Sequence, residues 1–312
     1  MPTILITTDY LTPGDEVDEY LTGRGFTTRH DPMRGPRPAG ELVAALAGVQ
    51  GALIANEPMS AEVLRQAPDL RAIVRTGVGY DSVDVPAATR LGISVSNLPG
   101  INSNAVAEYT IGLLLAQARQ FVPMAAGVAA GGWPRTDGRE LRGKTLGLIG
   151  RGAVARRVAP LAGAFGMTVL CTGDIPGATP APLDRLLRES DFVSVHTALT
   201  DRTRHLIDAA ALARMKPEAY LINTARGPIV DEAALASAVR SGRLAGAALD
   251  VVTVEPLPAD SVLRGVDGIT VFSHMAGQTA EARRDAGLEG ARELVAALAG
   301  HPAFPVDHKE DQ

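Results

Sequence analysis

The chain has 312 residues, 46% of them hydrophobic and 21% charged, so it can bury a sizeable core and its length favours about two domains. Its net charge is −5 and its Lys and Arg residues are scattered, which excludes a strongly basic surface for nucleic acid or anionic lipid. The single cysteine, Cys171, excludes an internal disulfide and a multi-cysteine metal site, and it suits the reducing cytoplasm, where we expect the protein.

The chain starts with an apolar run at residues 3–8, which follows no basic segment and is too short for a signal peptide or a membrane span. We interpret it as a first strand. Similar runs then alternate with Ala- and Leu-rich stretches of helical length, which predicts parallel sheets with helices on both faces. Further strands in the first part are expected at residues 52–55, 72–75 and 94–97, and helices at 41–46, 61–67 and 86–90.

A long apolar stretch at near-helical spacing follows at residues 104–126, and the breaker Gly-Gly-Trp-Pro comes after it at residues 131–134. We expect one long helix that leads into a second domain. Strands of this domain are expected at residues 145–149, 168–171, 192–196, 220–223, 247–251 and 270–273, with helices including 151–165 and 231–241. Six strands alternating with helices predict a nucleotide-binding domain.

A last apolar helix, expected at residues 281–299, follows the final strand and can return to pack on the first domain. The fold class is therefore α/β, with two doubly wound parallel-sheet domains, a Rossmann cofactor domain being inserted in a smaller flavodoxin-like substrate domain. We place the cofactor domain at residues 99–282 and build the substrate domain from residues 1–98 and 283–312.

A glycine-rich turn follows the strand at residues 145–149 and opens a helix. Gly150 allows the tight turn, Gly152 lets the backbone approach a pyrophosphate, and Ala155 takes the small packing position. The N–H groups at the start of the helix then face the anion. A glycine turn alone also fits an ordinary strand-to-helix connection, but the strand, the helix and a downstream acid together favour dinucleotide binding.

The downstream acid is Asp174, near the end of the next strand. A carboxylate at this place binds the adenosine ribose and repels a 2′-phosphate, so we expect NAD rather than NADP. Because Gly173 precedes it, Asp174 also fits an exposed loop aspartate.

Four further stretches follow expected strands, at residues 195–200, 222–227, 249–256 and 272–277. Ligands of open α/β sheets bind beyond the carboxyl ends of the strands, so all four can face one cleft. Arg226 follows a strand and precedes a rigid Gly-Pro turn, and its guanidinium suits a substrate carboxylate. A surface arginine or an interdomain salt bridge is the other interpretation.

Reducing a ketone requires a proton for the oxygen, and histidine supplies one near neutral pH. Of the six histidines, His274 is the best placed, although a histidine hydrogen-bonded within the core is a common alternative. Glu255 follows another strand and precedes Pro256; paired with His274, it would orient the ring and favour the imidazolium. On its own, Glu255 also fits a solvated loop carboxylate.

Together these residues resemble the D-isomer-specific 2-hydroxyacid dehydrogenases, the family of phosphoglycerate dehydrogenase, glyoxylate/hydroxypyruvate reductase, D-lactate dehydrogenase and formate dehydrogenase. The resemblance spans residues 70–279. It rests on motifs in the family's order, at residues 75–81, 97–100, 104–108, 150–155, 223–232, 250–256 and 273–277.

The resemblance implies an NAD(H)-dependent oxidoreductase acting on a small 2-oxo acid and its D-2-hydroxy acid, with Arg226, Glu255 and His274 as catalytic residues. It implies that the backbone of Thr76, Gly77, Val78 and Gly79, together with Arg226 and His274, binds the substrate. The cofactor site that it implies is lined by Val78, Gly150, Gly152, Ala153, Val154, Asp174, Thr197, Thr224, Ala225, Asp250 and Gly277. It also implies no catalytic metal and a homodimer formed through the cofactor domain by the long helix and the loop around Trp133.

Two positions depart from the family pattern. The carboxylate that ends the second cofactor strand usually stands one residue earlier, where this chain has Gly173. Phosphoglycerate and hydroxypyruvate enzymes commonly place an arginine after the strand at residues 52–55, where this chain continues Ala55-Asn56-Glu57. The chain also ends without the C-terminal regulatory domain of long phosphoglycerate dehydrogenases, so we expect no serine feedback through such a domain.

Two other functions stay open at this point. The same three residues could serve a related phosphonate- or phosphate-bearing acid, or phosphite. A non-catalytic NADH-sensing scaffold is the second alternative, since the family includes a transcriptional co-repressor, but the presence of all three catalytic residue types argues against it.

Overall fold

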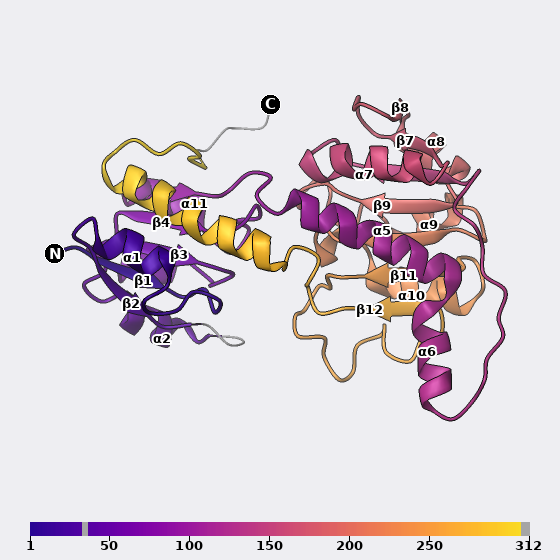
Figure 1. The fold of residues 1–312 in the computed structure, drawn as a ribbon, viewed down its shortest axis with the longest axis horizontal. Coiled ribbons are helices and arrows are strands. Elements are labelled where there is room, and N and C mark those ends of the chain that lie inside the picture. The colour runs from indigo at the N-terminus through magenta and orange to yellow at the C-terminus, as the bar shows by residue number, and fades with distance from the viewer. Residues whose placement is uncertain (33–36, 307–312) are drawn as a thin grey trace. The chain divides into compact units, whose positions relative to one another are not determined.

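The computed structural model describes residues 1–32 and 37–306, and the chain folds into two compact units (Figure 1). The first unit combines both ends of the chain, Met1–Asn102 and Gln278–Gln312, and the second unit is Ser103–Gly277. One unit is therefore inserted in the other. The borders expected from the sequence, after residues 98 and 282, lie a few residues from these breaks.

The first unit holds a five-stranded sheet in the order β2-β1-β3-β4-β5, with every neighbouring pair parallel. This is the doubly wound order of flavodoxin-like domains, and it reverses between β1 and β3. The strands are β1 (Thr3–Ile6), β2 (Thr27–His30), β3 (Gly51–Ile54), β4 (Ala72–Arg75) and β5 (Ser94–Ser96). The helices are α1 (Glu16–Thr22), α2 (Ala39–Leu46), α3 (Ala61–Arg65), α4 (Val85–Arg90) and α11 (Ala280–Leu298).

The second unit holds a seven-stranded parallel sheet in the order β12-β11-β10-β9-β6-β7-β8, which reverses between β6 and β9 as in Rossmann domains. Its strands are β6 (Thr145–Ile149), β7 (Thr168–Cys171), β8 (Thr179–Pro180), β9 (Phe192–Val195), β10 (Tyr220–Asn223), β11 (Gly246–Leu249) and β12 (Ile269–Val271). Its helices are α5 (Ser103–Arg119), α6 (Phe121–Ala129), α7 (Ala153–Ala164), α8 (Leu183–Glu189), α9 (Ala209–Arg214), the 3₁₀ turn η1 (Gly227–Ile229) and α10 (Glu232–Arg240). The expected α/β class is confirmed, and β8, the short strand beyond β7, is the strand of this unit that the sequence did not predict.

Helix α11 returns the chain to the first unit and lies along its sheet (Figure 1). Ala291 and Leu294 are fully buried in a core cluster that includes the β1 residues Ile4 and Ile6. A Cβ at Gly287 would stand 2.8 Å from Leu11, so the small residues of α11 allow a close approach. The expectation that the last helix packs on the first domain is confirmed.

The prediction of a single long helix at residues 104–126 is wrong. α5 ends at Arg119, Gln120 adopts a left-handed backbone with φ 52°, and α6 continues at an angle of 64° to α5. Pro123 explains the break. In a continuous helix its ring would collide with the carbonyl of Arg119, whereas the third position of a new helix needs no N–H donor.

No single helix within the described ranges is long and apolar enough to cross a membrane, and only the bent pair α5 and α6 reaches that length and apolarity together. Ala107, Leu113 and Leu114 of α5 are instead buried against the sheet of the second unit. α5 is thus a core helix of that unit.

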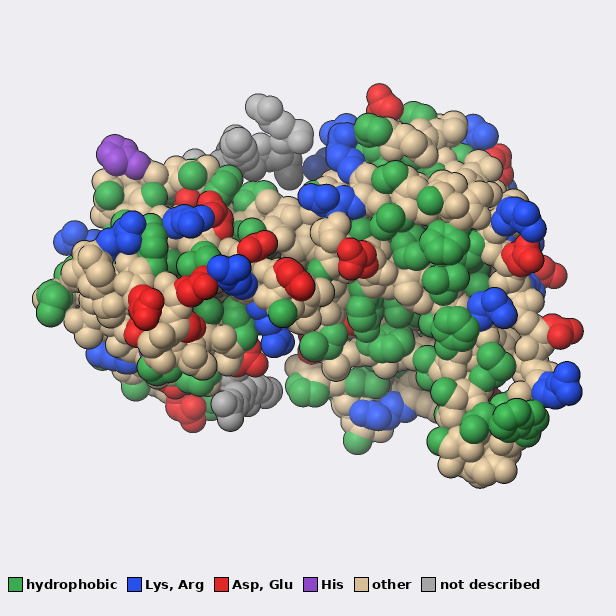
Figure 2. Space-filling model, viewed as in Figure 1, with side chains coloured by type: hydrophobic (Ala, Val, Ile, Leu, Met, Phe, Trp, Pro, Cys, Tyr) green, Lys and Arg blue, Asp and Glu red, His purple; other side chains and the backbone are tan. Residues whose placement is uncertain are grey.

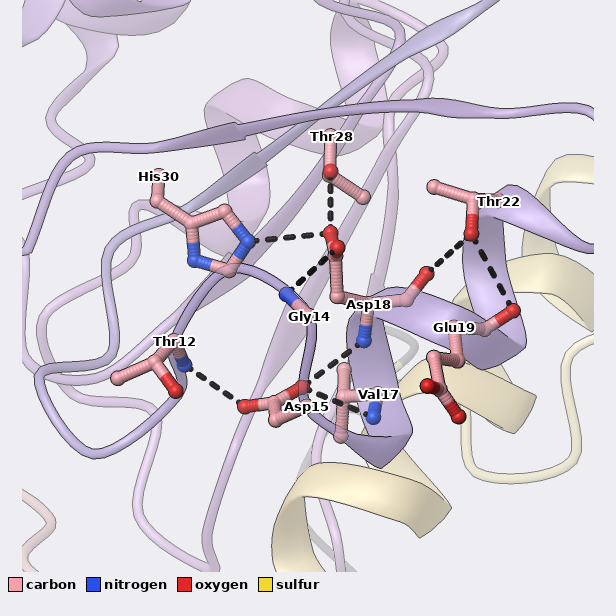
Figure 3. Close-up of polar contacts among 9 residues, drawn as sticks. All are labelled: Thr12, Gly14, Asp15, Val17, Asp18, Glu19, Thr22, Thr28 and His30. Carbon is pink, nitrogen blue, oxygen red and sulfur yellow. Dashed lines mark hydrogen bonds and ion pairs between the residues drawn. The ribbon is translucent and has the colours of Figure 1, made fainter.

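A polar cluster joins two elements that the sequence did not predict, α1 and the edge strand β2 (Figure 3). Asp15 caps α1 by accepting two backbone N–H groups of the first turn, each at 2.9 Å. Asp18 accepts from the Thr28 hydroxyl and from the Gly14 N–H at 2.9 Å, and it contacts His30 Nε2 at 3.2 Å. Burial raises the pKa of Asp18, but these contacts outweigh burial and hold the pKa below its usual value.

Candidate active site

The candidate residues of the second unit gather at the carboxyl edge of its sheet. All seven strands are parallel, so the loops that follow them leave the sheet at the same edge. Doubly wound sheets bind ligands at this edge, where the strand order reverses. The expected residues follow β6 (Gly150, Gly152, Ala153, Val154), β7 (Asp174), β9 (Thr197), β10 (Thr224, Ala225, Arg226), β11 (Asp250, Glu255) and β12 (His274, Gly277).

The turn after β6 has the geometry that a phosphate loop needs. Gly150 has φ 115°, and a Cβ there would stand 2.2 Å from the carbonyl oxygen of His196, so only glycine fits. Gly152 is the N-cap of α7, and apart from its chain neighbours no atom of the described residues lies within 4 Å of the place its Cβ would take. Ala155 is fully buried. The turn therefore leaves space beside the first N–H groups of α7, which suits a dinucleotide pyrophosphate.

Asp174 is exposed in the loop after β7. Gly173, directly before it, stands where the ribose-binding carboxylate of the family usually lies. Arg151 covers this glycine, since a Cβ on Gly173 would lie 2.7 Å from the Arg151 side chain. Asp174 is the exposed carboxylate that follows β7, and its contact with an adenosine ribose stays a prediction.

The backbone turn that carries Arg226 is tightly fixed. Asn223 is buried; its side-chain amide donates to the Arg226 carbonyl at 2.9 Å, and its Oδ1 accepts from the Ala225 N–H at 3.0 Å. A Cβ on Gly227 would lie 2.0 Å from the carbonyl carbon of Val252, so the turn requires glycine there. The rigid turn sets the starting direction of the Arg226 side chain.

The structure brings together the two residues expected to form an acid–base pair. His274 Nδ1 lies 2.8 Å from Glu255 Oε2, and the side chains are 32% and 37% exposed. Glu255 Oε1 accepts from the Val252 N–H at 3.1 Å. Since Nδ1 faces the carboxylate, Nε2 is the ring atom left for proton transfer.

Burial alone would raise the pKa of Glu255. The hydrogen bond and charge of His274, the Val252 N–H and the charge of Arg226 outweigh burial and hold that pKa below its usual value. Glu255 is therefore an ionised partner of the ring at neutral pH. The charge of Arg226 thus acts on the same carboxylate.

Asp250 holds the loop that presents His274. Its buried carboxylate accepts from the Met275 N–H at 2.9 Å and from the Ala276 N–H at 2.8 Å, and its carbonyl accepts from the His274 N–H at 2.8 Å. His274 itself adopts a left-handed backbone with φ 60°. Asp250 thus fixes an unusual turn, and its expected contact with the cofactor stays a prediction.

Tyr109 of α5 supports this loop and was missed by the sequence analysis. Burial, together with the charge of Asp250 and a hydrogen bond to it, raises the pKa of Tyr109 to about 12. Its ring packs edge-on against Phe272, with centroids 5.9 Å apart. Tyr109 lies in an apolar helical stretch, so no signal in the sequence separates it from an ordinary core residue.

His196, which follows β9, is less suited than His274 to donate a proton. Its Nε2 lies 2.9 Å from Ser194 Oγ, and burial lowers its pKa to about 4. The ring is therefore neutral in the pH range where a general acid is needed.

In the first unit, the loop after β4 has the open N–H groups that an anion requires. The carbonyls of Gly77 and Val78 accept hydrogen bonds from the Leu98 N–H at 2.9 Å and the Asn97 side chain at 2.6 Å. For the N–H groups of Val78 and Gly79, no acceptor is found among residues 1–32 and 37–306. The role of this loop in binding the substrate stays a prediction.

No group of His, Cys, Asp and Glu within the described part of the chain is arranged to hold a metal ion. Thr224, expected at the cofactor site, lies 3.4 Å from the Thr110 hydroxyl of α5. Thr197, Ala225 and Gly277 are half-buried beside the loops described above.

Residues 111–276 match the model of the NAD binding domain of D-isomer specific 2-hydroxyacid dehydrogenases. The chain belongs to this family. It is thus an oxidoreductase with an NAD-binding domain.

Named relatives match most of the chain. A glyoxylate reductase of Thermofilum pendens is 40% identical over 82% of this chain and 80% of its own length. An (S)-sulfolactate dehydrogenase of Chromohalobacter salexigens is 44% identical over 77% of this chain and 82% of its own length. The crystal structure of a glyoxylate reductase from Paecilomyes thermophila is 30% identical, with a TM-score of 0.87 over 99% of both chains.

Proposed function

We propose that this enzyme transfers a hydride between NAD(H) and a small 2-oxo acid to form the D-2-hydroxy acid, with His274 as general acid and base. The 2.8 Å contact between His274 Nδ1 and Glu255 Oε2, at the edge where Rossmann sheets bind their cofactor, carries this proposal. A reductase needs a proton donor at that edge, and an imidazole held by an ionised carboxylate is such a donor.

Each of the three residues has one task in reduction. When bound, NADH supplies the hydride. His274 holds a proton on Nε2 and gives it to the ketone oxygen; Glu255 fixes the ring and stabilises its protonated form. Arg226 holds the substrate carboxylate through two parallel hydrogen bonds. In the first unit, the open N–H groups of Val78 and Gly79 can donate to a substrate carboxylate. In oxidation, His274 accepts the proton from the hydroxyl group.

The turn at Gly150 and Gly152 supports a dinucleotide as cofactor, because it leaves room beside the N–H groups of α7. Asp174 supports NAD over NADP, since a carboxylate beside the ribose repels a 2′-phosphate. The remaining residues expected to line this site are Val78, Ala153, Val154, Thr197, Thr224, Ala225, Asp250 and Gly277.

The enzyme acts, in this proposal, as a cytoplasmic homodimer formed through the second unit. α6 has no buried residue, and Phe121, Val128 and Trp133 are 50%, 48% and 80% exposed. Hydrophobic side chains gather on the face that carries α5 and α6 (Figure 2). Apolar surface of this kind is typical of an interface between subunits.

The direct test is NADH oxidation with glyoxylate, hydroxypyruvate, pyruvate, phosphohydroxypyruvate and bulkier 2-oxo acids. We expect turnover with at least one acid and tighter binding of NADH than of NADPH. His274→Ala should lower kcat by about 10²-fold or more while NADH binding is retained. An enzyme that binds NADH but oxidises it with no acid would instead favour the non-catalytic scaffold. Reduction of NAD+ by phosphite, with no turnover of any 2-oxo acid, would favour that oxyanion.

A further inference from the structure

The carboxyl edge of the first sheet carries a basic residue, Arg283, that the proposed chemistry does not use. The order of this sheet reverses between β1 and β3, which is where a doubly wound sheet binds a ligand. Tyr10 lies in the loop after β1, and Thr76 lies in the loop after β4. By this general rule the edge is a place where a ligand can bind.

Arg283 lies on the face of α11 that turns toward this sheet. Residues 283, 287 and 290 share one face of a helix because they are four and three positions apart. On that face, a Cβ on Gly287 would lie 2.8 Å from Leu11, and a Cβ on Gly290 would lie 3.4 Å from Thr76. Both neighbours follow the ends of their strands. Arg283, one turn nearer the start of α11, therefore extends past the sheet and over the loops of its carboxyl edge.

The contacts of Arg283 hold it in place without neutralising it. Its guanidinium carbon lies 5.3 Å from the centre of the Tyr10 ring, and its Nε donates to Gln278 Oε1 at 2.8 Å. No carboxylate in residues 1–32 and 37–306 forms an ion pair with it. Its neighbour Arg284, by contrast, pairs with both carboxylate oxygens of Glu16, at 3.1 and 3.2 Å.

Tyr10 connects this cation to the loop proposed to hold the substrate carboxylate. Burial and, to a lesser extent, the charge of Asp9 raise the pKa of Tyr10, although the Thr76 hydroxyl and the charges of Arg75 and Arg283 act in the opposite direction. The Thr76 hydroxyl also lies 3.4 Å from that of Thr8. Thr76 is the first residue of the loop that carries the open N–H groups of Val78 and Gly79. Arg283 is thus separated from that loop by one aromatic ring.

We infer that Arg283, seated on Tyr10, binds a second negatively charged group of the substrate. The inference rests on the proposed function, and it makes the substrate a 2-oxo acid with an anionic substituent, a sulfonate, phosphate ester or carboxylate, at the end opposite its own carboxylate. Arg283 Nε donates to Gln278, so the two Nη groups of the guanidinium remain to bind the substrate. Their planar geometry matches the oxygens of such anions.

The test compares kcat/KM for two sets of acids, with Arg283→Gln as the variant and Arg284→Gln as its matched control. The charged set is sulfopyruvate, phosphohydroxypyruvate and oxaloacetate; the uncharged set is glyoxylate, pyruvate and hydroxypyruvate. We expect the wild type to favour the best charged acid by about tenfold or more, since a guanidinium–anion contact is a charge-assisted hydrogen bond. The charged acid with the highest kcat/KM relative to the uncharged acids identifies the anionic group that Arg283 binds.

Arg283→Gln should remove most of that preference through KM, with kcat/KM for the uncharged acids within about threefold of the wild type. Arg283→Lys, which keeps the charge but loses the planar fork, should retain part of it. Added salt should weaken the preference in the wild type and leave Arg283→Gln unaffected. Arg284→Gln should match the wild type throughout.

The second anion site would be overturned if the wild type had a higher kcat/KM for the uncharged acids, or if Arg283→Gln lowered kcat/KM for both sets of acids equally. Either result would leave the proposed function intact. Failure of the wild type to oxidise NADH with these six acids and with the bulkier 2-oxo acids would overturn the proposed function itself.

Discussion

The proposed role of Arg226 in binding the substrate carboxylate depends on the planar shape of its guanidinium as well as on its charge. The turn that carries it is fixed by Asn223 and by the close approach of Gly227 to the chain after β11. Its guanidinium can hold a carboxylate with two parallel hydrogen bonds, which a lysine ammonium cannot reproduce.

We therefore expect Arg226→Lys to raise KM for the 2-oxo acid and to lower kcat, each by about tenfold or more, because a bidentate contact orients as well as binds. Steady-state kinetics measure both constants, and fluorescence titration with NADH measures cofactor affinity, which should change little. A large loss of NADH affinity would place Arg226 at the cofactor instead.

Arg226, Glu255 and His274 could be selected from the sequence because each follows an apolar run that reads as a strand. Parallel strands bring the residues after them to one edge, so their order in the chain was sufficient. Tyr109 and Arg283 could not be selected in this way. Their contacts depend on how helices α5 and α11 pack against the sheets, which the local sequence does not reveal.

Among the elements, the loop after β12 is the one whose conformation matters most for the chemistry. His274 has φ 60° there. Three backbone N–H groups of the loop donate hydrogen bonds to Asp250, which holds the loop in place. Tyr109 of α5 contacts the same carboxylate. We regard Tyr109 as a positioning residue for His274.

Tyr109→Phe keeps the ring against Phe272 but removes the hydroxyl contact with Asp250. The free energy of unfolding should fall by about 1 kcal/mol, and kcat should fall roughly threefold to tenfold with the NADH affinity retained. Urea denaturation and steady-state kinetics measure the two effects, with Tyr20→Phe in the first unit as control. Lower stability with an unchanged kcat would show that Tyr109 only supports the fold.

Most strands of both sheets could be predicted, since β4, β6, β7 and β10 have the expected bounds. β2 could not, because this edge strand is Thr-Thr-Arg-His, alternates between exposed and half-buried positions, and lacks an apolar pattern. Hydrogen bonds to Asp18 hold it instead (Figure 3). Pro123 indicates the break at Gln120, because in a continuous helix its ring would collide with the carbonyl of Arg119.

At the scale of the whole molecule, the exposed helix α6 makes the oligomeric state testable. A hollow of about 400 Å³, lined by residues that include Val122, Pro123 and Phe272, lies beside it. The wild type should have the mass of a dimer in light scattering. Val128→Asp combined with Trp133→Asp should weaken dimerisation at least about 100-fold, because charges at a hydrophobic interface are costly to bury.

Leu161→Asp, at an exposed position of α7, serves as the control and should leave the dimer intact. A monomeric wild type, or a dimer that resists both substitutions on α6 and the following loop, would contradict this interface.

The central claim is that His274 and Glu255 act as one proton-transfer unit, and pH profiles of kcat in both directions test it most directly. Reduction requires the protonated ring, so it should fall as pH rises, while oxidation should rise over the same range. The pKa of Glu255 is held below its usual value, so this carboxylate is already ionised there and does not cause the transition. Glu255→Gln removes the charge that stabilises the imidazolium, and both profiles should move to lower pH. Profiles that stay in place while chemistry limits the rate would contradict the coupled pair.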